Sequence, residues 1–265
     1  MNILVCMKQV PDTTEIKIDP VTNTLIRDGV PSIVNTFDRY ALEMAARIKD
    51  KQEAKIVVMS MGPEQAKNAL KECLSVGADK AYLITDRAFG GSDTLATGYI
   101  LSKAVAAVEA EEGPFDIILC GKQAIDGDTA QTCPQLAEHL NYPQITCVAE
   151  MTAEPGKVRA ERETEQGREI WESPTPVLIT VTKTAYEPRY PSVKSKMSAS
   201  KAVIPSLTMN EVKADPEKCG LKGSPTKVKK TFVPVRNKNG TIIKDGTAAE
   251  SAKKLVVLLS GAGLV

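Results

Sequence analysis

The amino-acid sequence predicts an α/β fold with a doubly wound, mostly parallel sheet. Five apolar runs of strand length recur through the first 150 residues, and their continuous hydrophobicity is typical of parallel strands covered on both faces. They occupy positions 3–7, 56–60, 81–84, 117–120 and 145–148. Segments with helical spacing of apolar residues separate the runs, as expected for repeated strand–helix units. Ligands of such folds bind beyond the carboxyl ends of the strands.

Composition narrows the class of protein. The 265 residues carry 34 Lys and Arg against 33 Asp and Glu, which gives no electrostatic case for binding nucleic acid or a charged membrane surface. Six cysteines without a C-x-x-C pair indicate buried thiols in a reducing compartment, and the single histidine, His139, argues against a histidine-based metal site. No apolar run reaches membrane-spanning length, so we expect a soluble, cytoplasmic protein without membrane insertion.

Between the first two strands the sequence predicts a hairpin and a helix. Residues 16–19 and 24–27 alternate in polarity around a turn, which is typical of a small hairpin. Asn35 or Thr36 then caps a helix that extends to Asp50 and carries apolar residues on one face.

Two more helices follow the second and third strands. The first opens at Gly62 and Pro63 and ends at Gly77. The second begins after a turn at residues 90–94 and extends to about Val108.

The character of the chain changes after residue 150. Residues 157–165 are rich in charge and alternate in polarity, as in a strand. The chain then turns at Gly167, and Ile170-Trp171 belong to a returning strand, which predicts a solvated hairpin. A sixth buried strand is expected at 177–182. Residues 202–245 are rich in Pro, Lys and Gly without long periodicity, so we expect this stretch to be disordered or laid across a partner. A last amphipathic helix, 248–259, is capped by Thr247.

Residues 121–132 (GKQAIDGDTAQT) form the most distinctive stretch. They link a buried strand to a helix, and a helix N-terminus after a glycine-bearing turn is a ready anion-binding site. We expect Asp128 or Thr129 to cap the helix, and Gly121 and Gly127 to let the backbone approach a ligand closely. The alternative is an ordinary strand-to-helix turn.

Other motifs limit the role of this stretch. Lys122 does not belong to a P-loop, because Asp116 occupies a position where that pattern needs glycine. No serine or cysteine has a plausible base. Small, polar or cap-forming residues gather in the loops after the other strands, at 6–9, 35–38, 61–62 and 89–94, and together these loops indicate a nucleotide site.

Three stretches resemble the small, beta subunit of electron-transferring flavoproteins. They are residues 2–12, residues 121–132, and residues 161–182 with the following Glu187-Pro188-Arg189-Tyr190. The resemblance implies an adenine-nucleotide alpha-hydrolase-like fold over residues 1–201. It also implies a partner-docking loop at 184–201 and a C-terminal arm, 202–265, that packs on an FAD-carrying alpha subunit.

The resemblance also implies site residues. The cofactor would contact Cys6, Lys8, Asn35, Thr36, Phe37, Asp38, Met61, Gly62, Gly121, Lys122, Gln123, Asp126, Gly127, Asp128, Thr129, Ala130, Gln131 and Thr132. NADH would contact Phe89, Gly90, Gly91, Ser92, Asp93 and Thr94. Partner docking would use Tyr190, Val193 and Met197, with Val193 standing where the family usually has leucine. No residue is expected to be catalytic or to bind a metal.

The resemblance does not decide which cofactor the subunit binds, because the family has two forms. In respiratory members the beta subunit binds AMP, and in electron-bifurcating members it binds a second FAD that is reduced by NADH. The loop 89–94 offers more donors than AMP needs, so we expect the bifurcating form. Electrons would then reach ferredoxin or flavodoxin and, through the alpha-subunit FAD, an acyl-CoA dehydrogenase; NADH oxidation would need the heterodimer. A non-redox adenylate-binding regulator is a further alternative.

Overall fold

The computed structural model divides the chain into two compact units, Met1–Lys229 and Lys230–Val265. The residues that it describes are 1–12, 31–229, 240–244 and 246–265. The hairpin expected at 16–27 lies outside the described residues.

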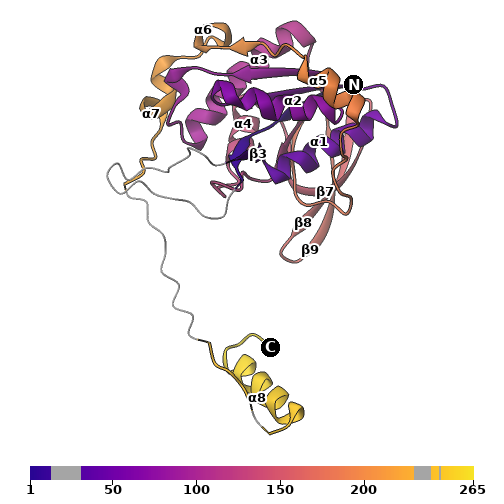
Figure 1. Ribbon diagram of the computed structural model, residues 1–265, viewed down its shortest axis with the longest axis vertical. Helices are drawn as coiled ribbons and strands as arrows, with labels where there is room; N and C mark the ends of the chain where they lie inside the picture. The colour runs from indigo at the N-terminus through magenta and orange to yellow at the C-terminus, as the bar shows by residue number, and fades with distance from the viewer. Residues whose placement is uncertain (13–30, 230–239, 245) are drawn as a thin grey trace. The chain divides into compact units, whose positions relative to one another are not determined.

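A nine-stranded sheet, counted within the described residues, organises the first unit (Figure 1). Its order is β11 (Ser206–Leu207), β5 (Lys80–Ile84), β4 (Lys55–Met61), β1 (Asn2–Cys6), β6 (Ile117–Gly121), β10 (Val177–Val181), β7 (Gln144–Glu154), β8 (Lys157–Thr164) and β9 (Gly167–Pro174). All pairs from β11 to β7 are parallel, and β8 and β9 extend the sheet antiparallel. The predicted α/β fold with a mostly parallel sheet is confirmed.

Helices cover both faces of the sheet, which gives three layers. Side chains of β1 alternate between two cores: Ile3 and Val5 pack with α1 (Thr36–Lys49) and α2 (Lys67–Ser75). Leu4 and Cys6 pack on the other face with α3 (Thr94–Glu112) and α4 (Thr132–Leu140). This double burial explains why the strands are continuously apolar in sequence.

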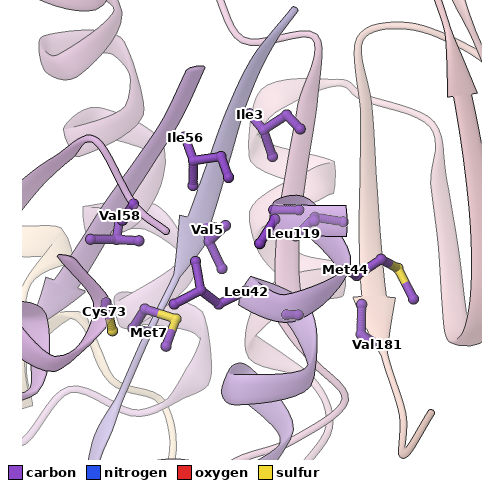
Figure 2. Packing of buried hydrophobic residues seen from close by; sticks show 14 of the residues in the cluster. Ile3, Val5, Met7, Leu42, Met44, Ile56, Val58, Cys73, Leu119 and Val181 are labelled. Atoms are coloured by element: carbon purple, nitrogen blue, oxygen red, sulfur yellow. The ribbon is translucent and has the colours of Figure 1, made fainter. Parts of the chain in front are cut away.

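Figure 2 shows part of the first core. Ile3, Val5 and Ile56 project from neighbouring strands toward Leu42 and Met44 of α1. All five side chains are almost fully buried. Because these strands are parallel, their carboxyl ends lie at the same edge of the sheet, where the loops that follow them come together.

The strand order reverses at β1. The chain passes from β1 through α1 to β4 on one side, and β6 later pairs with β1 on the other side. Cys6 and Cys120, near the ends of β1 and β6, are partners in register. A reversal of this kind is the usual place for a ligand in an open α/β sheet, because the connections leave toward opposite faces.

The antiparallel ribbon β7–β8–β9 matches the charged hairpin that the sequence predicts. Arg168 and Glu161 pair across it at 2.6 Å, and Arg162 lies over the ring of Trp171 at 5.4 Å. The ribbon extends beyond the helical layers at the edge of the sheet (Figure 1). Most of β9 is exposed, as expected for a solvated edge.

Residues after the sixth predicted strand also belong to the first unit. Part of the expected docking loop is a helix, α5 (Val193–Ser200), which packs on α2. The chain then adds β11 beside β5 and two short helices, α6 (Met209–Val212) and α7 (Gly220–Gly223). Because Ile204, Val212 and Cys219 are buried, residues 202–229 pack on their own domain, past the boundary expected at 201.

Several short elements complete the first unit. They are the antiparallel pair β2 (Gln9–Pro11) and β3 (Ser32–Val34), and the 3₁₀ turns η1 (Glu64–Ala66), η2 (Arg87–Phe89) and η3 (Pro216–Lys218). Pairing of β2 with β3 brings the chain after β1 back to Asn35, at the start of α1.

The second unit contains α8 (Ala248–Gly261), which begins where the sequence predicts. Thr247 and Glu250 form a reciprocal capping box at its N-terminus. Leu255, Val256 and Leu258 are exposed within this unit. Neither α8 nor any other helix of the described residues is long and apolar enough to cross a membrane.

Candidate functional site

A cleft of about 340 Å³ lies at the carboxyl ends of β1 and β6, where the strand order reverses. Its lining residues are Cys6, Met7, Lys8, Asn35, Asp38, Met59, Met61, Ser92, Asp93, Thr94, Thr97, Leu101, Cys120, Gly121, Lys122, Gln123, Ala124, Gly127, Thr129, Ala130, Gln131, Thr132 and Cys133. The N-terminal ends of α3 and α4 therefore both reach the cleft, and each presents the positive end of a helix dipole.

Asp38 joins the two strand ends beneath the cleft. Its Oδ2 accepts the Lys8 backbone N–H at 2.7 Å, and its Oδ1 accepts the Gly121 N–H at 3.0 Å. Burial raises the pKa of this carboxyl to about 7, although the hydrogen bonds with Asn35, Lys8 and Gly121 oppose the rise. Asp38 is thus a structural bridge across the point where the strand order reverses.

Gly121 is required by close packing against α1. A Cβ at this position would lie 2.4 Å from Asp38 Oδ1 and 2.6 Å from the Cβ of Phe37. Its φ is not left-handed, so the reason for glycine here is contact with protein rather than with a ligand.

Asn35 holds the loop 121–132 in place. Its side-chain Nδ2 donates to the Gln123 carbonyl at 2.8 Å, and its Oδ1 accepts the Ile125 N–H at 3.1 Å. Asn35 is the residue before α1, as the sequence predicts, but its side chain does not cap that helix. It is 1% exposed, and these two bonds join its side chain to the loop.

The loop is further fixed by its own polar groups. Lys8 Nζ lies 2.6 Å from Asp126 Oδ1, and Gln123 Nε2 donates to Asp128 Oδ1 at 2.7 Å. The Asp128 N–H is also used inside the loop, by the Ala124 carbonyl at 2.9 Å. Both carboxylates thus have a hydrogen-bond or ion-pair partner near the loop: Asp126 pairs with Lys8, and Asp128 accepts from Gln123.

The expected cap of α4 is wrong. Neither Asp128 nor Thr129 caps this helix; the residue before it is Gln131, which makes no side-chain capping bond. Asp128 and Ala130 have φ near +50°, and these left-handed turns bring the chain to the helix without a cap. Gly127, by contrast, has no left-handed φ.

Uncapped N–H groups therefore stand at the start of α4. Among the described residues, no group accepts from the backbone N–H of Thr129, Ala130, Gln131 or Thr132, or from that of Cys133. All five residues line the cleft. A row of unsatisfied donors at a helix N-terminus is a site for an anion such as phosphate.

The floor of the cleft is apolar and rich in sulfur. It contains Cys6, Met59, Met61, Cys120 and Cys133, and no aromatic residue is among the described residues that line the cleft. Burial raises the pKa of the Cys120 thiol well above its usual range, so this thiol stays neutral. Polarisable, uncharged sulfur suits contact with the face of a flat ring.

Comparison with known proteins decides the family. The model of the electron transfer flavoprotein domain matches residues 22–212, which is most of the chain. The chain belongs to the electron transfer flavoprotein family.

Similar proteins identify the subunit within this family. The chain is 53% identical to the electron transfer flavoprotein subunit beta of Megasphaera elsdenii, over 92% of each chain. It is 51% identical to the subunit beta of Thermoanaerobacterium thermosaccharolyticum over 98% of each chain. It is 46% identical to the caffeyl-CoA reductase-Etf complex subunit CarD of Acetobacterium woodii, over 97% of each chain. Our expected resemblance to the flavoprotein beta subunits is confirmed.

Membership of this family gives the chain a role in electron transfer and implies an alpha-subunit partner. The cleft of this flavoprotein subunit gathers residues from all the stretches in which a cofactor was expected. Of the expected contacts, Thr36, Phe37, Gly62, Asp126 and Asp128 do not line it. Asp126 and Asp128 instead shape the loop, and Phe37 packs beneath Gly121.

The loop expected to contact NADH is only partly open to the cleft of the flavoprotein subunit. Ser92, Asp93 and Thr94 line the cleft, whereas Phe89 is buried in the core and Gly91 packs beneath Leu221. Ser92 Oγ accepts the N–H of Gly220 at 3.0 Å. Part of this loop therefore packs against residues 220–221 rather than facing the cleft.

Asp93 caps α3 rather than facing a ligand. Its Oδ1 accepts the Ala96 N–H at 3.0 Å, and its Oδ2 accepts the Thr226 N–H at 3.0 Å. Burial acts to raise the pKa of Asp93, but the bonds from Ala96 and Thr226 prevail and hold it below its usual range. This carboxylate is therefore engaged on both oxygens.

Sequence reasoning missed several lining residues. They are Met7, Met59, Thr97, Leu101, Cys120, Ala124 and Cys133. Met59 and Cys120 lie inside strands, one residue or two before the loops that were considered. Side chains alternate between the two faces of a strand, so the sequence could have indicated which residues at the ends of β4 and β6 share a face with Cys6. Met59 and Cys120 are on that face.

The three expected docking residues are exposed on one short segment. Tyr190 is 86% exposed, Val193 79% and Met197 60%. Val193 and Met197 are four residues apart in α5, so they share one face of that helix.

Proposed function

We propose that this subunit binds FAD in the cleft and, together with an alpha subunit, oxidises NADH by electron bifurcation. When bound, the flavin would accept hydride from NADH and release the two electrons to separate acceptors. One acceptor is a low-potential carrier such as ferredoxin or flavodoxin; the other is an acyl-CoA dehydrogenase, reached through the alpha-subunit FAD. The chain itself supplies position and electrostatics.

The observation that carries this proposal is the row of unpaired N–H groups at the start of α4. Thr129 to Cys133 line the cleft without internal acceptors among the described residues. Lys122 also lines it, and no carboxylate in the described part of the chain forms an ion pair with its ammonium group. These donors and this charge fit the phosphates of an adenine dinucleotide.

The sulfur-rich floor supports adenine as the base. With no aromatic residue among the described lining, the faces of the ring would contact Met59, Met61 and the thiols of Cys6 and Cys133. Such sulfur–aromatic contacts contribute roughly 0.3–1.5 kcal/mol each. The adenylate half of the cofactor is therefore placed between this floor and the loop 121–132 in the proposal.

The extent of the cleft favours FAD over AMP. Lining residues continue past the adenylate region to Thr94, Thr97 and Leu101 of α3. Ser92 and Asp93 are hydrogen-bonded to residues 220–226. The hydroxyls of Thr94 and Thr97 are therefore the side-chain groups that we assign to ligand contact at this end of the cleft. We propose that NADH approaches along the 89–94 loop.

Binding of AMP in a purely structural role is the second candidate. A volume of about 340 Å³ lies near the lower end of the roughly 300–1,000 Å³ typical of ligand pockets, which favours a mononucleotide. In that case the subunit would take no part in NADH chemistry.

The two partner surfaces are also proposals. We assign contact with the alpha subunit to residues 230–265, because α8 exposes Leu255, Val256 and Leu258 within its own unit. We assign docking of the acyl-CoA dehydrogenase to Tyr190, Val193 and Met197.

The visible absorption spectrum of the purified heterodimer tests the proposal. Two flavins per heterodimer, with bleaching of both by NADH, are expected. One flavin per heterodimer, with AMP released on denaturation, would support the second candidate instead. A chain that is stable, monomeric and free of flavin on its own would point to a non-redox adenylate-binding regulator.

A further inference from the structure

Residues 186–189, which precede α5, pack against one face of α1. Tyr40, Glu43, Arg47 and Asp50 follow one another at spacings of three and four residues, so they form a single stripe along the helix. Each contacts a side chain from residues 186–189. These contacts are chemically diverse: a hydroxyl–carboxylate bond, a cation–π contact and ion pairs.

The strongest of these contacts joins Glu43 and Arg189. Glu43 Oε2 accepts the Arg189 Nε–H at 2.8 Å and the Arg189 backbone N–H at 3.0 Å, and its Oε1 accepts from Nη2 at 3.0 Å. The Glu43 side chain is 7% exposed. A buried carboxylate with three donors from one residue fixes both the backbone and the side chain of that residue.

Asp50 binds the same guanidinium group from the solvent-exposed side. Its two oxygens accept from Nη2 of Arg189 at 2.6 Å and from Nη1 at 3.3 Å. The hydrogen bonds and charges of Glu43 and Asp50 together raise the pKa of the Arg189 guanidinium, so it remains charged at all relevant pH values. A lysine could not span both carboxylates in the same way, because it lacks the planar fork.

Two weaker contacts also attach residues 186–187 to α1. Tyr40 Oη donates to Glu187 Oε2 at 3.3 Å, and the Arg47 guanidinium lies 4.0 Å from the centre of the Tyr186 ring. Both lie on the same stripe as Glu43.

What Arg189 fixes is the entry to α5. The exposed Tyr190 is the next residue, and Ser192 caps the helix by accepting the Ser195 N–H at 3.0 Å. At the far end of α5, Lys71 of α2 donates to the Ser200 carbonyl at 2.9 Å. The helix is thus attached at both ends, while the side chains of Tyr190, Val193 and Met197 are exposed.

We propose that Arg189, bound by Glu43 and Asp50, is a positioning residue that holds Tyr190, Val193 and Met197 in the arrangement a partner protein recognises. This inference rests on the proposed docking function of those three residues. The partner is an acyl-CoA dehydrogenase, and docking to a preformed surface avoids the entropic cost of ordering the segment on binding. Arg189 is not among the described residues that line the nucleotide cleft, so we expect its replacement to leave cofactor binding unchanged.

The test uses Arg189→Gln in the full heterodimer, with Arg168→Gln as matched control. Arg168 forms an exposed ion pair with Glu161, away from α1. Two quantities are measured: the rate of tryptic cleavage after Lys194 and Lys196, and the affinity for the acyl-CoA dehydrogenase of the same organism. Arg189→Gln should raise the cleavage rate and weaken the affinity by about tenfold or more, as expected when the buried Glu43 carboxylate loses its charged hydrogen-bond partner.

Further variants separate positioning from general loss of stability. Asp50→Asn removes only the exposed negative charge and should change both quantities by a few-fold, roughly the effect of one exposed ion pair. Arg189→Lys should restore part of the affinity, and flavin content should stay at the wild-type value in every variant.

Unchanged cleavage and unchanged affinity in Arg189→Gln would overturn the proposal. So would an equal effect of Arg168→Gln. If the wild-type heterodimer binds no acyl-CoA dehydrogenase, the proposed docking function fails, whereas faster cleavage in Arg189→Gln would still show that Arg189 fixes the segment.

Discussion

At the scale of single residues, the cleft depends on two buried polar side chains at the N-terminal end of α1. Asn35 and Asp38 both point away from their own helix and bind the loops that follow β1 and β6. Their polarity is costly to bury unless every group has a partner, and both have backbone partners here. The sequence marked these positions as a possible cap and a possible ligand contact, but it could not show that their partners are loops far away in the chain.

The buried carboxyl of Asp38 should make stability depend on pH. Its pKa in the folded protein is raised to about 7 from an ordinary 3.8, so the folded state binds the proton more tightly. The contribution of Asp38 is complete below about pH 4 and is lost as pH rises to 7, at up to about 1.4 kcal/mol per pH unit. Thermal unfolding between pH 5 and 7 should therefore show a smaller loss of stability in Asp38→Asn than in the wild type. Equal slopes in the two proteins would contradict this.

Gly121→Ala should destabilise the nucleotide-free chain. The new methyl group would lie 2.4 Å from Asp38 Oδ1 and 2.7 Å from the Asp38 backbone nitrogen, and overpacking of this kind typically costs about 1–3 kcal/mol. Gly127→Ala is the matched control in the same loop, because its methyl group would meet no atom within 4 Å. The free energy of unfolding, measured by denaturant titration, separates the two; equal values would disprove the packing role of Gly121.

At the scale of secondary structure, periodicity predicted the elements well. The strands at 3–7, 56–60, 81–84 and 117–120 and the helix from Asn35 to Asp50 all appear as expected. These elements bury one or both faces, and burial leaves a local signature in the sequence.

Elements without such a signature were missed. α5 has little amphipathic pattern, because it exposes Val193 and Met197, and it was expected to be a loop. β11 is only two residues long, and its place beside β5 depends on a long-range pairing. The missing cap of α4 has no local signature either, because Asp128 accepts from Gln123 and the helix begins only at Thr132.

The C-terminal end of α3 provides a prediction about stability in acid. The Glu112 side chain is 1% exposed and pairs with Lys55 at 2.5 Å and Lys80 at 2.8 Å, and Tyr82 Oη donates to it. Although burial acts to raise it, these partners lower the pKa of Glu112 to about 2. Its contribution is present above the ordinary value of 4.5 and is lost as pH falls toward 2.

Glu112→Gln should therefore lower stability at pH 7 by about 1.5–3 kcal/mol, the range for hydrogen bonds to charged groups. The difference from wild type should shrink as the pH is lowered from 5 to 3, as followed by urea unfolding. A difference that is constant over this range would show that the charge of Glu112 does not stabilise the fold.

At the scale of the whole molecule, the chain is a flavoprotein subunit with one folded unit and a separate C-terminal unit. The first unit ends at Lys229, later than the composition of 202–245 suggested, because Ile204, Val212 and Cys219 supply buried contacts in a stretch that otherwise reads as polar. Short apolar anchors of this kind carry no period, so sequence alone could not assign them. The second unit, with its exposed apolar helix, is the part for which we propose the alpha subunit as partner.

The central claim is that the cleft beside residues 121–132 holds the adenylate half of a cofactor. Gly127→Val tests it most directly in the heterodimer, because Gly127 lines the cleft but an added Cβ would meet no protein atom within 4 Å. Nucleotide released on denaturation is quantified per heterodimer, together with the thermal stability of the nucleotide-free form. We predict unchanged stability of that form and a nucleotide affinity weakened by about tenfold, a loss of about 1.4 kcal/mol. Wild-type nucleotide content and affinity in the variant would contradict the claim.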